Sequence, residues 1–313
     1  MTLTEKIKQK ALQLGFDLIG ITDASPVGPE HIDRFKQWLN SDHAARMSYM
    51  QKNFEKRTHP AKLFPPAKSV ICTALNYKPP KTKFKPPKKL AGKVAAYVRY
   101  EDYHTFIKNK LRLLANFIAP LAGPDFKFKI CVDSAPLAER ALAQRAGLGF
   151  IGKNHILTNP TLGPQLLLGE LLTNLELQTD TPITANCKAC NKCLDACPTK
   201  ALQPDGAFDA NKCISYLTIE HKGDILPLLA EKIADRLFGC DTCLLACPYS
   251  DSAPLCRDTD FKFHPERTNL HLDYILKLTQ EKFESDFADS PMTRTPLKKL
   301  KSTAKICLKN SKS

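Results

Sequence analysis

The chain has 313 residues, of which 43% are hydrophobic, and a formal net charge of +14. This length exceeds one small module and is enough for one large or two modest domains. No stretch reaches the 18 or more apolar residues of a membrane span, and the amphipathic, acid-containing N-terminus differs from an export signal, so we expect a cytoplasmic protein without a membrane partner.

Helices and strands are predicted to alternate over residues 1–178. The N-terminal segment has helical spacing, with an apolar face formed by Leu3, Ile7, Ala11 and Leu14. A second amphipathic helix is expected at 104–118. Apolar runs predict strands at 17–22, 69–77, 95–100 and 128–134. This alternation predicts an α/β domain.

Two further segments follow this domain. The polar sequence TDTPITAN (179–186) is a predicted linker that opens a cysteine-rich module over residues 179–256. Residues 257–313 are expected to form a helical, basic extension that includes the helical stretch HLDYILKLTQEKF. The predicted fold class is therefore α+β, with an N-terminal α/β domain, the cysteine-rich module and a short helical tail.

Eight of the twelve cysteines lie in or near two closely spaced runs. The first run reads C-x2-C-x2-C-x3-C-P and contains Cys187, Cys190, Cys193 and Cys197. The second reads C-x2-C-x3-C-P and contains Cys240, Cys243 and Cys247, with Cys213 upstream in place of its first cysteine.

This pattern predicts two [4Fe–4S] clusters. In bacterial ferredoxins, the cysteine before proline in one run ligates the cluster of the other run. Cluster 1 is therefore assigned to Cys187, Cys190, Cys193 and Cys247. Cluster 2 is assigned to Cys197, Cys213, Cys240 and Cys243. A zinc site needs four ligands and does not account for two such runs, and structural disulfides do not suit a chain without an export signal.

The remaining cysteines follow no ligand spacing. Cys72 and Cys131 lie within apolar runs, where we expect buried, inert thiols. Cys256 and Cys307 are left without a predicted role.

Positive charge is concentrated in two segments. Residues 78–93 hold seven lysines and residues 290–313 hold six lysines and one arginine, and neither segment contains an acidic residue. Exposed segments of this kind can contact phosphates, so they favour a nucleic-acid partner, although a solvated loop and a frayed tail would have the same composition.

Five motifs resemble those of the epoxyqueuosine reductase family. They are EDYH (101–104), VDSAPLAERALAQRAGLGFIGKN (132–154), CKACNKCLDACPTKAL (187–202), CISYLTIEHKG (213–223) and GCDTCLLACP (239–248). The resemblance runs from the first helix to about residue 300. Phe150 and His155 stand where the family more often has Trp and Thr, and a helical-repeat tail found in longer members is absent.

The resemblance implies an enzyme that reduces epoxyqueuosine to queuosine in the anticodon loop of tRNA, the last step in making that base. It also implies a cobalamin cofactor held by the N-terminal domain, bound without a protein histidine on cobalt. The two clusters would carry single electrons to it from an external low-potential donor. We expect a monomer.

Removal of an epoxide oxygen needs two electrons and protons, because the alkoxide is a poor leaving group unless it is protonated. Asp133 matches the proton donor of the family. Burial beside a corrin would raise the pKa of this carboxyl group toward neutrality. From local sequence alone, Asp133 would instead cap a helix beginning near Ala135.

Other residues are assigned by their positions in the family motifs. Cobalamin contacts are expected from Arg57, Asn154, Ser215 and Asp241. Substrate contacts are expected from Tyr103, His104, Arg140, Lys153 and His221. For His104, the alternative is a residue that serves the start of its own helix. If cluster 2 lies nearer cobalt, Ser215 and Asp241 could face the corrin, because they neighbour its ligands Cys213 and Cys240.

Two other classes of protein share these features. A cobalamin-dependent reductive dehalogenase or similar small-molecule reductase has two clusters and a corrin, but it needs no basic segments and is often exported by a twin-arginine leader, which this sequence lacks. A ferredoxin-like electron carrier would contain no corrin. Corrin absorbance and dependence on tRNA would separate the three.

Overall fold

The structure is a computed structural model that describes residues 1–81 and 90–311. A four-stranded sheet has the order β1-β2-β7-β4, and every pairing in it is antiparallel. Its strands are β1 (Leu18–Asp23), β2 (Ser69–Asn76), β4 (Phe128–Cys131) and β7 (Leu166–Thr173). Helices and strands do alternate as predicted. Strand β7, although it is the last of the four in the chain, lies between β2 and β4 and is antiparallel to both.

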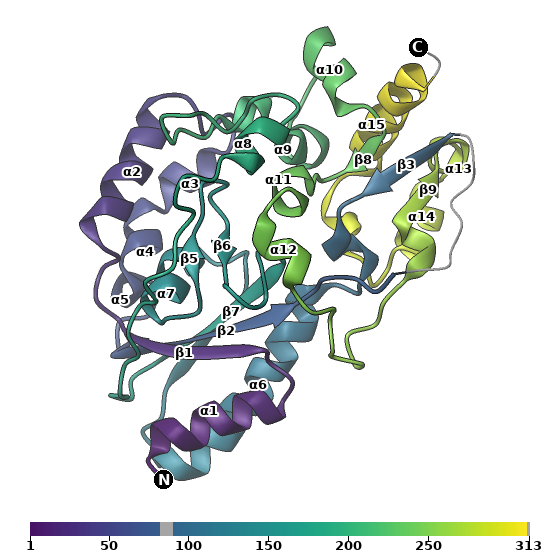
Figure 1. Ribbon diagram of the computed structural model, residues 1–313. Coiled ribbons are helices and arrows are strands. Elements are labelled where there is room, and N and C mark those ends of the chain that lie inside the picture. The colour runs from purple at the N-terminus through teal and green to yellow at the C-terminus, as the bar shows by residue number, and fades with distance from the viewer. Residues whose placement is uncertain (82–89, 312–313) are drawn as a thin grey trace.

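Helices cover both faces of this sheet (Figure 1). One face packs against α1 (Leu3–Gln13) and α6 (Tyr103–Ala122), and the other packs against α7 (Glu139–Arg145). Alternate residues of β2 point to opposite sides, so Ile71 and Leu75 join the α1/α6 core while Val70 and Cys72 join the α7 core. Gly169 allows close approach, because a Cβ there would lie 2.5 Å from Ile107 of α6.

The helix boundaries follow from local capping. Thr2 and Glu5 form a capping box at the start of α1. Asp102 caps α6 by accepting the backbone N–H of His104 at 3.0 Å. Short helices then extend the α7 side of the sheet: α2 (Pro29–Asn40), α3 (Ser48–Lys52), α4 (Phe54–Thr58) and α5 (Pro60–Leu63). A hairpin of β5 (Phe150–Ile151) and β6 (Leu157–Thr158) follows α7.

The cysteine-rich module consists of short elements. They are α8 (Lys192–Ala196), η2 (Ala210–Lys212), α9 (Ile214–Ile219), α10 (Pro227–Ile233), β8 (Arg236–Phe238), α11 (Thr242–Leu245) and α12 (Pro248–Ser252). Pro248 takes the first position of α12, where its missing N–H costs no hydrogen bond. The predicted linker is fixed in place, because the carboxylate of Asp180 accepts the Ile21 N–H at 2.8 Å and pairs with Lys8.

A second sheet brings three distant parts of the chain together. Its order is β8-β3-β9, with β3 at Ala91–Val94 and β9 at Asn269–His271. It shares a hydrophobic core with α13 and α15. The C-terminal elements are η3 (Pro265–Thr268), α13 (Leu272–Lys277), α14 (Gln280–Asp286), η4 (Pro291–Arg294) and α15 (Leu297–Asn310). The domain boundaries at 178 and 256 stay a prediction, but this sheet contains strands from all three segments.

Most sequence-based expectations for secondary structure are confirmed. The strand predicted at 95–100 is wrong, because Ala96–Arg99 form the 3-10 helix η1 and the strand β3 ends at Val94. The Ala96 N–H donates to Asp241 Oδ2 at 2.6 Å, which replaces a strand partner. Cys72 and Cys131 are buried as expected, and burial raises the pKa of both thiols. No helix in the described ranges is long and apolar enough to cross a membrane.

The two basic segments differ. Residues 82–89, which include Lys83, Lys85, Lys88 and Lys89, lie outside the described residues. Within the C-terminal segment, residues 297–310 form α15, whose apolar face is buried at Leu300, Ala304 and Cys307 while Lys298 and Lys305 are exposed. This part of the segment is therefore a packed helix with exposed lysines.

Candidate functional site

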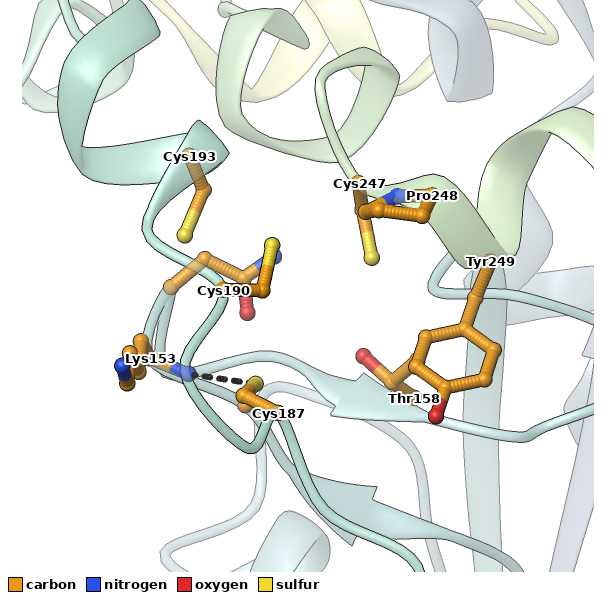
Figure 2. A pocket seen from close by; sticks show the side chains of 10 residues that line it. Lys153, Thr158, Cys187, Cys190, Cys193, Cys247, Pro248 and Tyr249 are labelled. Carbon is orange, nitrogen blue, oxygen red and sulfur yellow. Dashed lines mark hydrogen bonds between the residues drawn. The ribbon is translucent and has the colours of Figure 1, made fainter.

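The four thiols assigned to cluster 1 line one pocket. Cys187, Cys190 and Cys193 come from the loop before α8 and from α8 itself, and Cys247 comes from the start of α12 (Figure 2). The backbone N–H of Lys153 donates to Cys187 Sγ at 3.4 Å. The ligand assignment stays a prediction, and the meeting of Cys247 with three thiols of the first run supports it.

The thiols assigned to cluster 2 also lie together. Burial raises the pKa of Cys243, and the thiolates of Cys240, Cys213 and Cys197 raise it further. Burial likewise raises the pKa of Cys213, with contributions from Cys240 and Cys197. Mutual electrostatic influence of this kind requires proximity, so the structure is consistent with the second predicted ligand set.

Asp133 lies in the loop between β4 and α7. Its backbone has a φ of 54°, in the left-handed region that non-glycine residues rarely adopt. The alternative role as a helix cap is wrong, because α7 begins only at Glu139 and its N-cap residue is Ala138. The Asp133 carboxylate instead contacts His104 of α6. It therefore does not serve as the cap of α7.

A chain of three side chains links Asp133 to the start of α6. Asp133 Oδ2 lies 3.1 Å from His104 Nε2, and His104 Nδ1 lies 2.6 Å from Asp102 Oδ1. The His104 ring is buried and stacks on Tyr103, with 4.0 Å between the ring centroids. His104 therefore orients the Asp133 carboxylate, and its link to Asp102 fixes the imidazole in turn.

The groups in this chain act against the effect of burial on Asp133. Burial raises the pKa of Asp133, but the hydrogen bond and charge of His104, the charge of Arg294 and a hydrogen bond from Tyr103 lower it more. The net pKa is below the ordinary value in the protein without a cofactor, and the shift toward neutrality beside a bound corrin stays a prediction. The pKa of His104 is raised, since its interactions with Asp102 and Asp133 outweigh the lowering by burial.

The Asp133 carboxylate is accessible and has charged or polar neighbours from several elements. Its side chain is 57% exposed. It interacts electrostatically with Tyr49 of α3, Arg57 of α4 and Arg294 of η4. An accessible carboxylate with such neighbours is a candidate point of contact for a bound molecule.

Arg57 and Arg140 belong to this region. Both guanidinium groups interact with Asp133 and Glu139, and the Arg140 guanidinium also donates to the carbonyl of His155. Arg57 Nε is buried and has no hydrogen-bond partner among the described residues. An unpaired buried donor is costly, so a bound group with an acceptor would fit here.

Lys153 and Asn154 lie at the clusters instead. Lys153 Nζ donates to Asn191 Oδ1 at 2.7 Å, and Asn154 Nδ2 donates to the Cys243 carbonyl at 3.4 Å. Asn154 thus lines the cluster 1 pocket and contacts a residue assigned to cluster 2. His221 is placed differently, with Nε2 3.1 Å from the Asp224 carbonyl oxygen and its ring against Tyr216.

Asp241 and Ser215 accompany the second group of thiols. The backbone N–H of Ser215 donates to the Cys213 thiol. Burial raises the pKa of Asp241, whose carboxylate accepts the Ala96 N–H. Tyr97 experiences the charges of both Asp241 and Asp133, so its hydroxyl group lies near both carboxylates. Since Asp241 follows Cys240, Tyr97 connects the surroundings of the second thiol group with those of Asp133.

Several participants were not predicted from the sequence. Asp102 lies in the EDYH motif beside Tyr103 and His104, which were the predicted substrate contacts. Tyr97 was assigned to a strand, and Arg294 to a basic tail. Glu139 and Glu170 were not considered, although a lone glutamate within the apolar run LLLGELLT is a signal for a buried charged group.

Thiols grouped in fours define an iron–sulfur protein, and the carboxyl group oriented by His104 is its candidate reactive group. The family model "Epoxyqueuosine reductase QueG, DUF1730" matches residues 57–134, and the model "4Fe-4S double cluster binding domain" matches residues 186–250. This chain belongs to the epoxyqueuosine reductase family. Its cysteine-rich module is accordingly a domain for two iron–sulfur clusters.

Relatives match nearly the whole chain. The epoxyqueuosine reductase of Leadbetterella byssophila is 38% identical, over 95% of this chain and 96% of the relative. That of Vibrio cholerae is 35% identical, over 93% of this chain and 79% of the relative.

Solved structures agree with this similarity. The enzyme of Streptococcus thermophilus is 31% identical with a TM-score of 0.90, and covers 99% of this chain and 82% of its own. An epoxyqueuosine reductase bound to a tRNA stem loop that carries epoxyqueuosine has a TM-score of 0.92 at 32% identity, with the same coverage. A Bacillus subtilis structure, described with its catalytic aspartate loop swung out of the active site, has a TM-score of 0.90 at 32% identity.

Proposed function

We propose that this protein reduces epoxyqueuosine to queuosine in tRNA, with electrons from an external low-potential donor. The observation that carries the proposal is the Asp102–His104–Asp133 chain, which orients an accessible carboxyl group. Tyr97 lies within electrostatic range of both Asp133 and Asp241, which supports a site near the thiols assigned to cluster 2. The similar structure with a modified tRNA stem loop supports tRNA as the substrate. We also propose that the protein acts in the cytoplasm as a monomer.

Cobalamin is the proposed cofactor of the site around Asp133. The unpaired Nε of Arg57 fits a group rich in amide oxygens, and Ser215 and Asp241 would face it from the side of cluster 2. Asn154 and Asp241 already bond to the backbone, so they would hold the cofactor through their remaining atoms. When bound, cobalamin supplies a cobalt centre that accepts electrons one at a time.

The residues of this chain would manage the protons. Asp133 would donate a proton to the epoxide oxygen as the C–O bond breaks, so that the oxygen does not leave as an alkoxide. His104 would hold the carboxyl group in the correct orientation. Tyr103, Arg140, Lys153 and His221 remain proposed substrate contacts, and of these Tyr103 and Arg140 lie beside Asp133.

The direct test is anaerobic turnover of tRNA that contains epoxyqueuosine, with added cobalamin and a strong reductant. Nucleosides from digested tRNA would be measured by mass spectrometry. Queuosine formation that depends on both tRNA and cobalamin supports the proposal. Cofactor-loaded protein that leaves epoxyqueuosine unchanged contradicts it.

We expect His104→Ala to lower the maximal turnover and to extend activity to higher pH. The hydrogen bond and charge of His104 lower the pKa of Asp133, so their removal raises that pKa and keeps the carboxyl group protonated at higher pH. The pH–rate profile at saturating tRNA measures this effect. An alkaline limb at an unchanged position would show that His104 does not control the protonation of Asp133.

We also expect the exposed lysines of α15 to bind tRNA phosphates. The double variant Lys298→Gln/Lys305→Gln should bind tRNA more weakly and flatten the salt dependence of log Kd by roughly 0.7–0.9 for each phosphate that is no longer neutralised. Turnover at saturating tRNA should remain. Lys127→Gln/Lys129→Gln, at and just before the edge strand β4, removes the same charge outside both basic segments and serves as the control. Equal salt slopes for the two variants would indicate that α15 is only solvated.

A further inference from the structure

A buried carboxyl group lies directly behind the Asp133 loop. Glu170 is 0% exposed and belongs to β7, on the face that packs against α7. Neither of its carboxyl oxygens has a hydrogen-bond partner that donates to it among the described residues. Because a buried charge without a partner is costly, this side chain requires an explanation.

The neighbour of Glu170 is a second glutamate. Glu139, the first residue of α7, lies within hydrogen-bonding reach of Glu170. Two carboxylates contain only acceptors, so a hydrogen bond between them requires one proton. The pKa of Glu139 is raised to about 7, first by burial and then by the charge of Asp133, and that of Glu170 is raised by burial and by Glu139. Close to neutral pH, this pair holds a proton.

The pair is connected to Asp133 through the backbone. Glu139 Oε1 accepts the N–H of Asp133 at 2.5 Å. The left-handed conformation of Asp133 costs about 1–3 kcal/mol for a residue with a side chain, so it persists only where the surrounding structure holds it. The hydrogen bond to Glu139 holds the backbone N–H of the strained residue directly.

The remaining groups around the pair do not replace the shared proton. Across the sheet, Glu170 is opposite Cys72 and Cys131, whose thiols stay neutral because burial raises their pKa values. The nearby positive charges are Arg57 on α4 and Arg140 and Arg145 on α7. The nearby negative charge is that of Asp133 in its loop.

We propose that Glu139 is a positioning residue for Asp133, and that a proton shared between Glu139 and Glu170 keeps Glu139 in that position. With the proton present, Glu139 bridges the buried Glu170 and the Asp133 backbone. When the proton leaves, two adjacent carboxylates repel each other, and the partly exposed Glu139 moves away from Glu170. The Asp133 loop then loses its anchor. The positioning role of Glu139 rests on the proposed function only in those tests that measure turnover of epoxyqueuosine tRNA.

Two substitutions of Glu139 test the anchor. Glu139→Ala removes the acceptor and should lower turnover at saturating tRNA by about 10-fold or more, with unchanged tRNA affinity. This is less than the roughly 10²–10⁴-fold loss expected for removing the general acid itself. Glu139→Gln should restore most of this loss, because its amide oxygen accepts the Asp133 N–H while its amide N–H₂ donates to Glu170. Glu176→Gln, at a side chain that is 88% exposed, is the control and should match the original protein.

The pH dependence adds a specific signature. In the original protein, part of the activity should disappear as pH rises through about 7, where Glu139 ionises. The amide group of Glu139→Gln donates to Glu170 without a titratable proton. The pH–rate profile of this variant should therefore lack the loss of activity near pH 7 and should keep the pH dependence that is due to Asp133. Identical profiles for the two proteins would overturn the role of the shared proton. A Glu139→Gln enzyme as inactive as Glu139→Ala would overturn the positioning role.

Two readouts do not depend on turnover. In cofactor-loaded protein without tRNA, hydrogen exchange of the segment 131–138 should be faster in Glu139→Ala than in Glu139→Gln. The carboxyl pKa is higher in the folded than in the unfolded state, so the pair destabilises the fold progressively between pH about 4.5 and about 7. The Tm of Glu139→Gln should therefore exceed that of the original protein more at pH 8 than at pH 5. Equal exchange rates in Glu139→Ala and Glu139→Gln, together with the same Tm difference at pH 5 and pH 8, would refute the positioning role of Glu139. This conclusion would hold even if the enzyme reduces epoxyqueuosine as proposed.

Discussion

The Asp133→Asn enzyme is expected to turn over epoxyqueuosine tRNA at least about 10²-fold more slowly than the original protein, the usual scale for losing a general acid. Asparagine keeps the size of the side chain and can accept a hydrogen bond from His104, but it has no acidic proton. Single-turnover rates under anaerobic conditions would measure the loss.

The matched control is Asp125→Asn, at an exposed carboxylate in the turn that precedes β4. It should retain full turnover. Iron content, cobalamin absorbance and tRNA affinity should be unchanged in both variants, because Asp133 is not placed among the thiols. A fully active Asp133→Asn enzyme would rule out the proton-donor role. A folded and cofactor-loaded but inactive enzyme would support it.

The second large effect is expected for Cys247→Ala. Anaerobically reconstituted protein should contain about eight irons in two cubes of four, and this variant should keep only about four. Because the thiol of Cys247 lines the pocket with those of Cys187, Cys190 and Cys193, the variant should lose cluster 1 and with it the transfer of electrons through both clusters.

Comparison among cysteine variants identifies which cluster is missing. The electron paramagnetic resonance spectrum of reduced Cys247→Ala should resemble that of Cys187→Ala and differ from that of Cys240→Ala. Cys256→Ala should retain all of the iron, since this thiol lies outside both runs. If Cys247→Ala instead resembled Cys240→Ala, or if the native metal were zinc, the assignment of ligands would be wrong.

The structure shows which parts of the fold local sequence could predict. Strands and helices with clear apolar periodicity, such as β2 and α6, were predicted to within a few residues. The order of the sheet was not, because β7 enters between β2 and β4 through pairings that span many residues. The segment 95–100 has strand-like composition, yet Asp241 binds the Ala96 N–H and η1 forms instead.

The site divides in the same way. Cysteine spacing predicted two ligand sets, since the spacing itself encodes the chemistry. The direction of the Asp133 pKa shift could not be predicted, because it depends on the balance between burial and the groups His104 and Arg294. Glu139 and Glu170 are 31 residues apart in sequence and meet only because α7 packs on the face of β7 that carries Glu170.

The sheet β8-β3-β9 has a consequence for how the protein unfolds. Because its three strands come from three regions of the chain, the Asp133 domain cannot separate from the cluster module without breaking the β3–β8 hydrogen bonds, or from the C-terminal extension without breaking those between β3 and β9. The two parts should therefore melt as one cooperative unit. Loss of a cluster through oxidation would then weaken the whole molecule, and a chain that has lost its electron pathway would become a preferred target for proteolysis.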